Sequence, residues 1–539
     1  MGTAHALQLL AVPVAAVAVA ALARRSGLAV APVLVLAGLV ASAVPGMPRF
    51  TLDPKFVLFV FLPPLLFSAA WESSYYDLKA NVRAIASLSV GLVLFTTFAV
   101  GWVTHLVVPG LPLAAAFVLG ALVAPPDAVA AVSVARRLGL PRRLVTILVG
   151  ESLFNDATAL TVFRVAVAAA AGEGVTLADA TGRFVYAAVA GAIVGLLLGP
   201  PLHRLSGRLD DPLVETAVPV LAPFAAYLIA ETVHASGVIA VVVSGLYLGH
   251  KFFESSAMSR LLGISVWRVM VFMLESVVFL LIGLQLTAVL SGLSARSRPG
   301  LAWYALAVFL TVVVTRFVWV FAADYLPIWF SRRVREREAG TGWRQRVIIS
   351  WAGMRGVVSL AAAFAIPMAT ENGRPFPGRD LLLFLTFSTV LATLVVQGLT
   401  FPALIRALGL QNEAERRARL LAAAAAYQAA TEAALARLDE LAAREDSEIA
   451  EEIIERLRML SEYRRLKAWE RLGGGIGPGG REVPSETYRR LRLEMLAAER
   501  ETFLRLRDER RIDDELLEEA LEELDLEEVM VMNTRSADL

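Results

Sequence analysis

The sequence predicts an all-α polytopic membrane protein followed by a charged helical tail. Of the 539 residues, 57% are hydrophobic, and the mean hydropathy is +0.62. The apolar residues form successive runs long enough to cross a hydrocarbon core of roughly 30 Å as helices. Charged residues are concentrated after Gln411. We therefore expect a transmembrane domain at residues 1–410 and a cytoplasmic helical domain at 411–539.

About 13 transmembrane helices fit these apolar runs. The break at 232–236 is the least marked, which leaves twelve spans as an alternative. The first run has no basic stretch before it, so we expect a retained span rather than a cleaved signal. The predicted spans are 5–23, 27–45, 54–70, 84–107, 112–135, 143–171, 182–203, 214–232, 236–249, 262–290, 300–323, 347–368 and 380–407.

Basic residues predict the orientation, because cytoplasmic loops of membrane proteins are enriched in Lys and Arg. Loops assigned to the cytoplasm carry 18 such residues, and loops assigned to the outside carry 7. The cytoplasmic set is Arg24, Arg25, Lys79, Arg83, Arg136, Arg137, Arg142, Arg143, Arg204, Arg208, Lys251, Arg260, Arg332, Arg333, Arg335, Arg337, Arg344 and Arg346. We expect a multi-pass protein of the cell (inner) membrane, with the N-terminus outside and the tail in the cytoplasm.

Several classes of function lack support in the sequence. The chain has no cysteine, which excludes disulfides and thiolate metal sites. It has no basic patch with interleaved aromatic residues, so a nucleic-acid partner is not expected. It has no HExxH, GxSxG or Walker motif, so hydrolytic or ATP-driven chemistry is not supported. We expect a protein that is not an enzyme and uses no cofactor.

Two predicted spans contain residues that interrupt a helix. Span 112–135 contains Pro125 and Pro126, which cannot donate helical hydrogen bonds. Span 347–368 contains Arg355 within a glycine-flanked stretch. Interrupted helices at corresponding places in two halves of a chain indicate a transporter site. Because these spans are seven apart, an odd number, the halves would be inverted repeats.

Span 143–171 carries a polar stripe. Glu151, Ser152, Asn155 and Asp156 recur at helical spacing, so they share one face of an apolar helix. A carboxylate inside a bilayer is costly and is a functional-site hypothesis by default. The stripe therefore indicates a buried site for a cation or a proton.

Asp127 is predicted at the same depth as Asp156. At a rise of roughly 1.5 Å per residue, Asp156 lies about 18 Å from the cytoplasmic face and Asp127 about 20 Å from the outer face. With the oxygens of Ser152 and Asn155 and freed backbone carbonyls, they form a hard, oxygen-rich site suited to Na⁺, Li⁺ or H⁺. A carboxylate that holds either a proton or a cation predicts antiport. In the alternative, the two acids only hold helices together.

The other intramembrane charges need partners. Glu151 and Arg355 are predicted at similar depth, so we expect a structural Glu151–Arg355 ion pair, since an unpaired buried charge is expensive. The alternative is that each finds a separate partner or water. Glu275 lies within span 262–290 and is predicted either to support the site or to pack against a neighbour.

The tail at 411–539 is predicted to be helical and charged. Helices are expected at 413–440 and 446–471, a flexible glycine-rich linker at 473–480, and a further helix start with Ser485 as N-cap. A solvated amphipathic bundle and a regulatory or partner-binding unit both fit this pattern.

Four segments form a specific combination: FLPPLLF (61–67), APPDAVAAV (124–132), GESLFNDATAL (150–160) and WAGMRGVVSLA (351–361). Through them, the region from about residue 50 to 405 resembles the monovalent cation/proton antiporters. The branch that it resembles is the sodium/proton exchangers, which include bacterial NhaP-like proteins. The resemblance implies inverted repeats with crossed, broken helices. It also implies a separate dimerisation part and a homodimer in the lipid membrane that works by alternating access.

The resemblance also implies roles for individual residues. Asp156 would bind the cation and exchange the proton, with Asp127, Ser152 and Asn155 beside it in the Na⁺ site. Glu151 and Arg355 would form the stabilising pair. The order Asn155–Asp156 is associated with electroneutral exchange of one cation for one proton, a function in pH homeostasis and sodium tolerance.

The chain departs from the family pattern at Pro126, where many members have Thr. The hydroxyl group is lost while a carbonyl oxygen beside the site remains. We expect Na⁺ as the transported cation, with Li⁺ and K⁺ as alternatives.

Two other classes of function use intramembrane carboxylates. An intramembrane aspartyl protease also has two aspartates on neighbouring spans, but its GxGD motif is absent around Asp127 and Asp156. A channel or a sensor would move ions without coupling them to protons.

Overall fold

The computed structural model describes residues 3–44, 54–172, 176–209, 211–291, 293, 300–330, 342–370, 374–410, 413–444, 451–470 and 482–532. Within these ranges the regular secondary structure is helical, apart from one isolated β-bridge between Ala369 and Pro375. The chain divides into two compact units, Met1–Gln411 and Asn412–Leu539. The predicted glycine-rich linker at 473–480 and the basic residues Arg332–Arg337 lie outside the described ranges.

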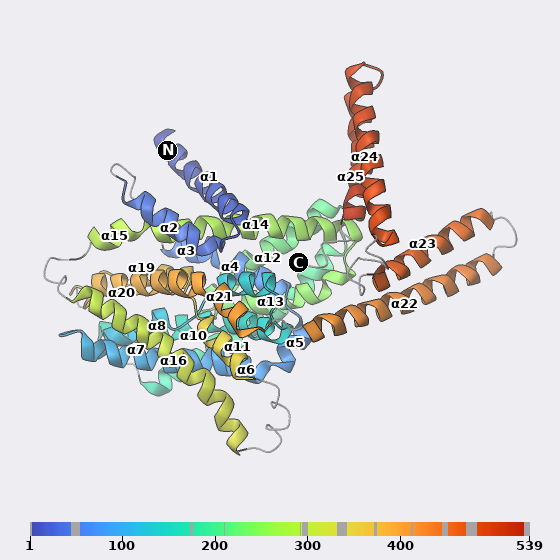
Figure 1. Cartoon of the computed structure of the whole chain (residues 1–539). Helices are drawn as coiled ribbons and strands as arrows, with labels where there is room; N and C mark the ends of the chain where they lie inside the picture. Colours follow the sequence, from blue (N-terminus) through green and yellow to red (C-terminus); the bar gives the residue numbers. More distant parts are fainter. Residues whose placement is uncertain are drawn as a thin grey trace. The chain divides into compact units, whose positions relative to one another are not determined.

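The first unit is an array of apolar helices (Figure 1). Eight helical segments are long and apolar enough to cross a membrane, and Val30–Ser42, Phe56–Trp71 and Leu113–Val123 are shorter apolar segments. The all-α polytopic prediction is thereby confirmed, while the count of thirteen stays a prediction. The elements are α1 (Thr3–Arg25), α2 (Val30–Ser42), α3 (Pro54–Val60), α4 (Leu62–Trp71), α5 (Tyr75–Ala80), α6 (Val82–Ala86), the π-helix η1 (Ser87–Leu92), α7 (Val93–Val107), α8 (Leu113–Val123), α9 (Ala128–Arg137), α10 (Arg142–Ala171), α11 (Leu177–Ser206), α12 (Pro212–Thr232), α13 (Gly237–Lys251), the 3₁₀-helix η2 (Phe252–Glu254), α14 (Ala257–Leu284), α15 (Leu286–Ser291), α16 (Leu301–Phe330), α18 (Trp343–Trp351), α19 (Val357–Phe364), α20 (Arg379–Ala392), the π-helix η4 (Thr393–Gln397) and α21 (Gly398–Leu408).

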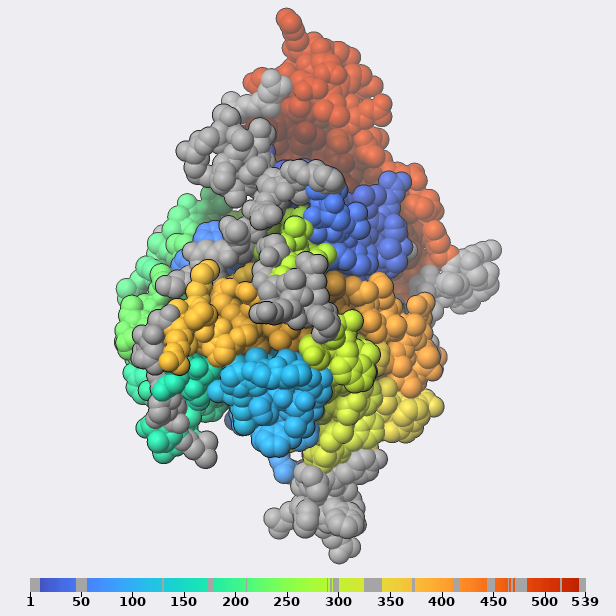
Figure 2. Space-filling model, turned by 90° about the vertical axis from the view of Figure 1, so that its left-hand side faces the viewer, coloured from blue at the N-terminus to red at the C-terminus, as the bar shows by residue number. Residues whose placement is uncertain are grey.

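These helices pack into two groups. We call α1–α4 and α11–α14 the α14 group, because they pack mainly against one another. We call η1, α7–α10, α16 and α18–α20 the α10 group for the same reason. Figure 2 shows part of the α10 group, where the blue surface of α7 lies beside the yellow-green surface of α16. The groups meet where α10 contacts α13 and where α19 contacts α3 and α14.

Two helices of the α14 group touch through their backbones. A Cβ added at Gly283 of α14 would lie 2.2 Å from the carbonyl oxygen of Val35, and one added at Gly38 of α2 would lie 2.3 Å from that of Leu280. Glycines at such crossings let membrane helices approach closely enough for dense van der Waals packing. The α2–α14 contact therefore depends on the absence of side chains at these two positions.

The two predicted interruptions are present. The α8 helix ends at Val123 and α9 begins at Ala128, with Pro125 and Pro126 between them. The α18 helix ends at Trp351 and α19 begins at Val357. Inside a bilayer, the backbone groups freed at such breaks need partners from the protein.

The second unit consists of helical hairpins: α22 (Glu413–Arg444) packs with α23 (Glu451–Glu470), and α24 (Pro484–Asp508) packs with α25 (Asp514–Met532) (Figure 1). Arg492 of α24 donates to both carboxylate oxygens of Glu527 of α25, each at 2.6 Å. These hydrogen bonds hold the pKa of the Glu527 carboxyl below its usual range. The tail is thus helical, as predicted, with charged side chains joining its second hairpin.

Replacing Gly283 with Val should destabilise the first unit, because the new Cβ would overlap the backbone of α2. Overpacking of this kind costs about 1–3 kcal/mol. The measurement is the melting temperature and the monodisperse yield of the purified protein in detergent. Gly182→Val is the matched control, because a Cβ at Gly182 of α11 meets nothing within 4 Å. Equal effects of the two substitutions would contradict the packing argument.

Candidate functional site

The two interrupted helices meet at their breaks. The backbone N–H of Asp127 donates to the carbonyl of Met354 at 2.6 Å. In the other direction, the guanidinium of Arg355 donates through Nη1 to the carbonyl of Ala124. Each break therefore provides the hydrogen-bond partner for a backbone group that lacks a helical partner at the other break. The structure thus contains the crossed, broken helices that the resemblance implied.

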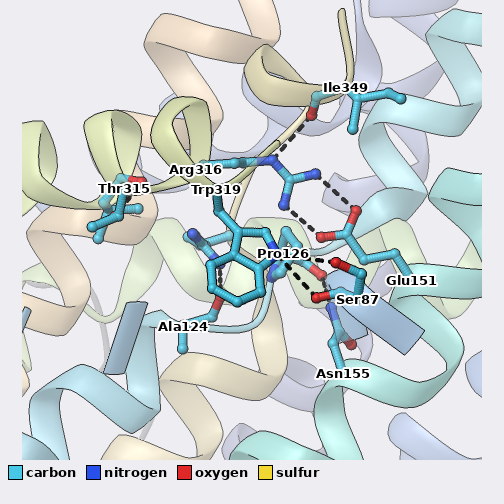
Figure 3. Close-up of polar contacts among 11 residues, drawn as sticks. Ser87, Ala124, Pro126, Glu151, Asn155, Thr315, Arg316, Trp319 and Ile349 are labelled. Atoms are coloured by element: carbon cyan, nitrogen blue, oxygen red, sulfur yellow. Dashed lines mark hydrogen bonds and ion pairs between the residues drawn. The ribbon is translucent and has the colours of Figure 1, made fainter. Parts of the chain in front are cut away.

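Asn155 ties α10 to this crossing. Its Nδ2 donates to the carbonyl of Pro126 at 2.6 Å, as the close-up in Figure 3 shows. The side chain is fully buried, and its Oδ1 has no hydrogen-bond partner in the described part of the chain. The sequence led us to expect freed carbonyls as cation ligands. In the structure, the carbonyls of Ala124 and Pro126 already accept hydrogen bonds from protein groups.

The predicted partner of Glu151 is wrong. Both carboxylate oxygens of Glu151 accept from Arg316 of α16, Oε1 from Nη1 at 2.5 Å and Oε2 from Nη2 at 2.8 Å (Figure 3). Both side chains are at most 2% exposed. A guanidinium engages a carboxylate through two parallel hydrogen bonds in this way. A buried ion pair therefore exists at Glu151, but Arg355 is not its partner.

Arg316 also caps the C-terminal end of α18. Its Nε donates to the carbonyl of Ile349 at 3.0 Å, within the last turn, where helical carbonyls lack intrahelical partners. Gly353 leaves the room that this side chain needs, since a Cβ there would lie 2.5 Å from Cδ of Arg316. One turn further along α16, Trp319 donates to the carbonyl of Ser87 in η1 at 3.1 Å. The α16 helix thereby connects α10, α18 and η1.

Arg355 is held inside the crossing instead. Its backbone N–H donates to Oγ1 of Thr393, at the start of η4, at 3.0 Å. The side chain is completely buried, and its Nε and Nη2 have no partner among the described residues. Its position places a positive charge between the breaks of α8–α9 and α18–α19.

A cavity lies between the two helix groups, and its empty space of about 660 Å³ includes a part that is open to the outside. Its α14-group wall consists of apolar residues of α3 and α4, from Val57 to Ala69. Four of its lining residues have polar side chains: Asp127, Ser152, Asp156 and Ser359. The structure thus brings together three of the predicted site residues and adds Ser359, which the sequence reasoning missed.

The two carboxylates have different surroundings. Asp127 lies against the start of α19, because a Cβ at its N-cap Gly356 would lie 1.8 Å from Oδ2 of Asp127. The positive end of the helix dipole stabilises a negative charge there. Asp156 is 7% exposed and makes no hydrogen bond or ion pair in the described part of the chain. No side chain of the described residues therefore pairs with its charge, which leaves that role to what enters the cavity.

Glu275 lies on α14, one turn before Val278. Val278 and Ile282, three and seven residues after it, line a second cavity against α19. Helical spacing places Glu275 on the same face, which points toward the α10 group. Its supporting role stays a prediction.

Arg316 is the site residue that sequence reasoning should have found. It is the one charged residue in the predicted span 300–323. An isolated charge in an apolar run is the signal that identified Asp156, and it applies equally to Arg316. Ser359 gave no such signal, because a lone serine in an apolar helix is common.

The chain is similar in sequence to a known family and to known proteins. The family described as sodium/hydrogen exchanger, transmembrane, matches residues 12–407. An uncharacterised Na⁺/H⁺ exchanger of Mycobacterium tuberculosis is 35% identical over 512 residues, covering 94% of this chain and 92% of the relative. A sodium, potassium, lithium and rubidium/H⁺ antiporter of Bacillus subtilis is 33% identical over 382 residues, covering 68% of this chain and 56% of that protein.

A similar fold is found among solved structures. The sodium proton antiporter MjNhaP1 from Methanocaldococcus jannaschii, determined at pH 8, matches with a TM-score of 0.58 at 20% identity. The match covers 74% of this chain and 97% of the other. At this identity the similarity supports the helical architecture.

Removing either member of the Glu151–Arg316 pair should destabilise the protein by about 3–5 kcal/mol, because an uncompensated charge stays buried. Glu151→Gln and Arg316→Ala should each lower the melting temperature and the folded yield. The double variant should be less damaged than the sum of the two single effects.

The same cycle with Arg355→Ala in place of Arg316→Ala is the matched control. It should show a smaller coupling to Glu151, because the two side chains share no hydrogen bond. A stronger coupling of Glu151 to Arg355 than to Arg316 would restore the pairing expected from the sequence.

Proposed function

The chain belongs to the sodium/hydrogen exchanger family, and we propose that it exchanges Na⁺ for H⁺ at the cavity lined by Asp127, Ser152 and Asp156. The family consists of secondary transporters rather than enzymes, which excludes the aspartyl protease alternative. The observation that carries the site assignment is the pair of carboxylates in one buried cavity, of which only Asp127 lies at a helix start. This proposal assigns the exchange to particular residues, which family membership alone does not do.

Asp156 is the group that exchanges the proton for the cation. Its carboxylate is buried and has no partner among the described residues, so its negative charge is expensive until a proton or a cation neutralises it. The two neutralising ligands compete for the same oxygens. Release of one therefore accompanies binding of the other, which is the coupling that antiport requires.

Asp127 and Ser152 supply further oxygens for the cation. Carboxylate and hydroxyl oxygens are hard ligands that suit Na⁺ and Li⁺. Asn155 acts on the site by fixing the carbonyl of Pro126, and so the position of the break next to Asp127. Glu151 and Arg316 hold α10 and α16 in register without touching the cavity.

Alternating access would come from movement of the α10 group against the α14 group. The cavity lies between the groups, with its carboxylates on one of them and an apolar wall on the other. Two ion pairs among the described residues join the groups at the surface: Arg136–Glu72 at 2.8 Å and Arg164–Glu231 at 3.3 Å. Exposed pairs contribute about 0–1 kcal/mol each, so they break easily during a movement.

The proposal also covers the transported cation, the oligomeric state and the orientation of the chain in the membrane. The name of the Bacillus subtilis relative includes Na⁺, K⁺, Li⁺ and Rb⁺, which supports a tolerant site. A homodimer in the lipid bilayer, exchange in the service of pH homeostasis and sodium tolerance, and use of no cofactor follow from the resemblance. The excess of basic residues supports an external N-terminus and a cytoplasmic tail in the cell membrane.

Asp156→Asn should abolish exchange, because an amide can neither release a proton nor balance a cation's charge. The protein is reconstituted in proteoliposomes with an acidic interior and a pH-sensitive dye, and Na⁺, Li⁺ or K⁺ is added outside. The wild type should dissipate the pH gradient, and the variant should not. Asn81→Asp, at the C-cap of α5 and outside the cavity lining, is the control for handling, and its activity should match the wild type. Persistent exchange in Asp156→Asn would refute the assignment.

Exchange should be electroneutral, with one cation for one proton. In the same proteoliposomes, clamping the membrane potential with valinomycin and K⁺ should leave the rate of Na⁺-driven proton movement unchanged. A rate that follows the imposed potential would show net charge transfer. Cation flow that persists without proton movement would instead support a channel.

A further inference from the structure

Ser359 is the fourth polar residue of the cavity and has no part in the function proposed so far. It lies in the first turn of α19, three residues after the N-cap Gly356. It is 2% exposed and lines the same cavity as Asp127, Ser152 and Asp156. Its hydroxyl makes no hydrogen bond within the described ranges.

Several buried hydroxyl groups in other helices donate to the backbone, although those of Thr96, Thr104, Thr216 and Ser350 also have no partner in the described part of the chain. Thr97, Thr386 and Ser244 donate to carbonyls three or four residues earlier, at 2.8, 2.8 and 3.0 Å. This is the usual arrangement for a hydroxyl within a helix. Ser359 makes no such bond in the described part of the chain, although the residue three positions earlier, Gly356, is the N-cap of its helix.

The backbone around the other break offers few free oxygens. The carbonyl of Ala124 accepts from Arg355, and the carbonyl of Pro126 accepts from Asn155. With these two carbonyls engaged, side-chain oxygens are the main ligands that the cavity offers to a cation. Among the residues lining the cavity these belong to Asp127, Ser152, Asp156 and Ser359, and all other lining side chains are apolar or glycine.

We propose that the Ser359 hydroxyl is a ligand of the transported monovalent cation and helps to set its affinity and selectivity. The inference rests on the proposed function and extends the ion site from α9 and α10 onto α19. A buried hydroxyl without a protein partner gains one when a cation, or water carried with it, occupies the cavity. Asp127 contacts the start of the same helix, so both groups move with the crossing as one unit.

The test is the Na⁺ dependence of exchange by full-length Ser359→Ala in proteoliposomes. The half-saturating Na⁺ concentration should rise roughly 3- to 10-fold, as expected for loss of one ligand interaction. The maximal rate should stay within about twofold of the wild type. Ser359→Thr keeps the hydroxyl and should retain the affinity while changing the ratio of Na⁺ to Li⁺ affinity.

Two further variants make the test specific. Ser244→Ala removes an equally buried hydroxyl that bonds Val241 and lies outside the cavity, so its Na⁺ dependence should not change. Ser359→Cys keeps the size but offers a soft sulfur, a poor ligand for Na⁺. It should behave like Ser359→Ala, and it replaces that variant if the latter does not fold. The rise in melting temperature that Na⁺ causes in the purified protein should shrink in both Ser359 variants.

The outcomes separate this inference from the proposed function. If Ser359→Ala and Ser359→Cys bind Na⁺ as the wild type does, while Asp156→Asn is inactive, only the role of Ser359 is overturned. An equal loss of affinity in Ser244→Ala would also overturn it, because the effect would then be a general one on packing. If the wild type shows no Na⁺-driven proton movement, the proposed function itself fails.

Discussion

The hydrogen bonds between the two interrupted helices are the constraint on which the site depends. A helix that breaks inside a membrane exposes N–H and C=O groups that lipid cannot satisfy. Here the N–H of Asp127 binds the carbonyl of Met354, and Arg355 binds the carbonyl of Ala124. Neither break is stable without the other, so the crossing forms as one structure. The position of the Asp127 carboxylate, against Gly356, follows from that crossing.

A second level of support comes from α16. Arg316 neutralises Glu151 and binds a terminal carbonyl of α18, so one buried side chain joins three helices of the α10 group. Strong buried contacts thus lie within this group, whereas exposed ion pairs such as Arg136–Glu72 join it to the α14 group. This distribution favours movement of the α10 group as a rigid body. It also keeps the carboxylates fixed relative to one another while their access changes.

The sequence predicted the helical segments, both breaks and the two cavity carboxylates, because each leaves a one-dimensional signal. Apolar runs, the Pro125–Pro126 pair and an isolated acid such as Asp156 can be recognised without knowing the neighbours. The partner of Glu151 could not be found in this way. Depth along the membrane normal allowed both Arg316 and Arg355, and only the lateral arrangement of the helices distinguishes them. The loss of two carbonyls to Asn155 and Arg355 is likewise a tertiary fact.

The proposed exchange of one proton for one cation fits the balance of charges around the cavity. Glu151 and Arg316 cancel within the protein. The Asp127 carboxylate lies against Gly356, the N-cap of α19, where the helix dipole offsets part of its negative charge. Asp156 is then the one cavity carboxylate whose charge the described residues leave uncompensated. A single proton or a single monovalent cation restores neutrality there, and a second positive charge would meet the field of Arg355. The proposed stoichiometry thus depends on the number of unbalanced charges rather than on the number of oxygens.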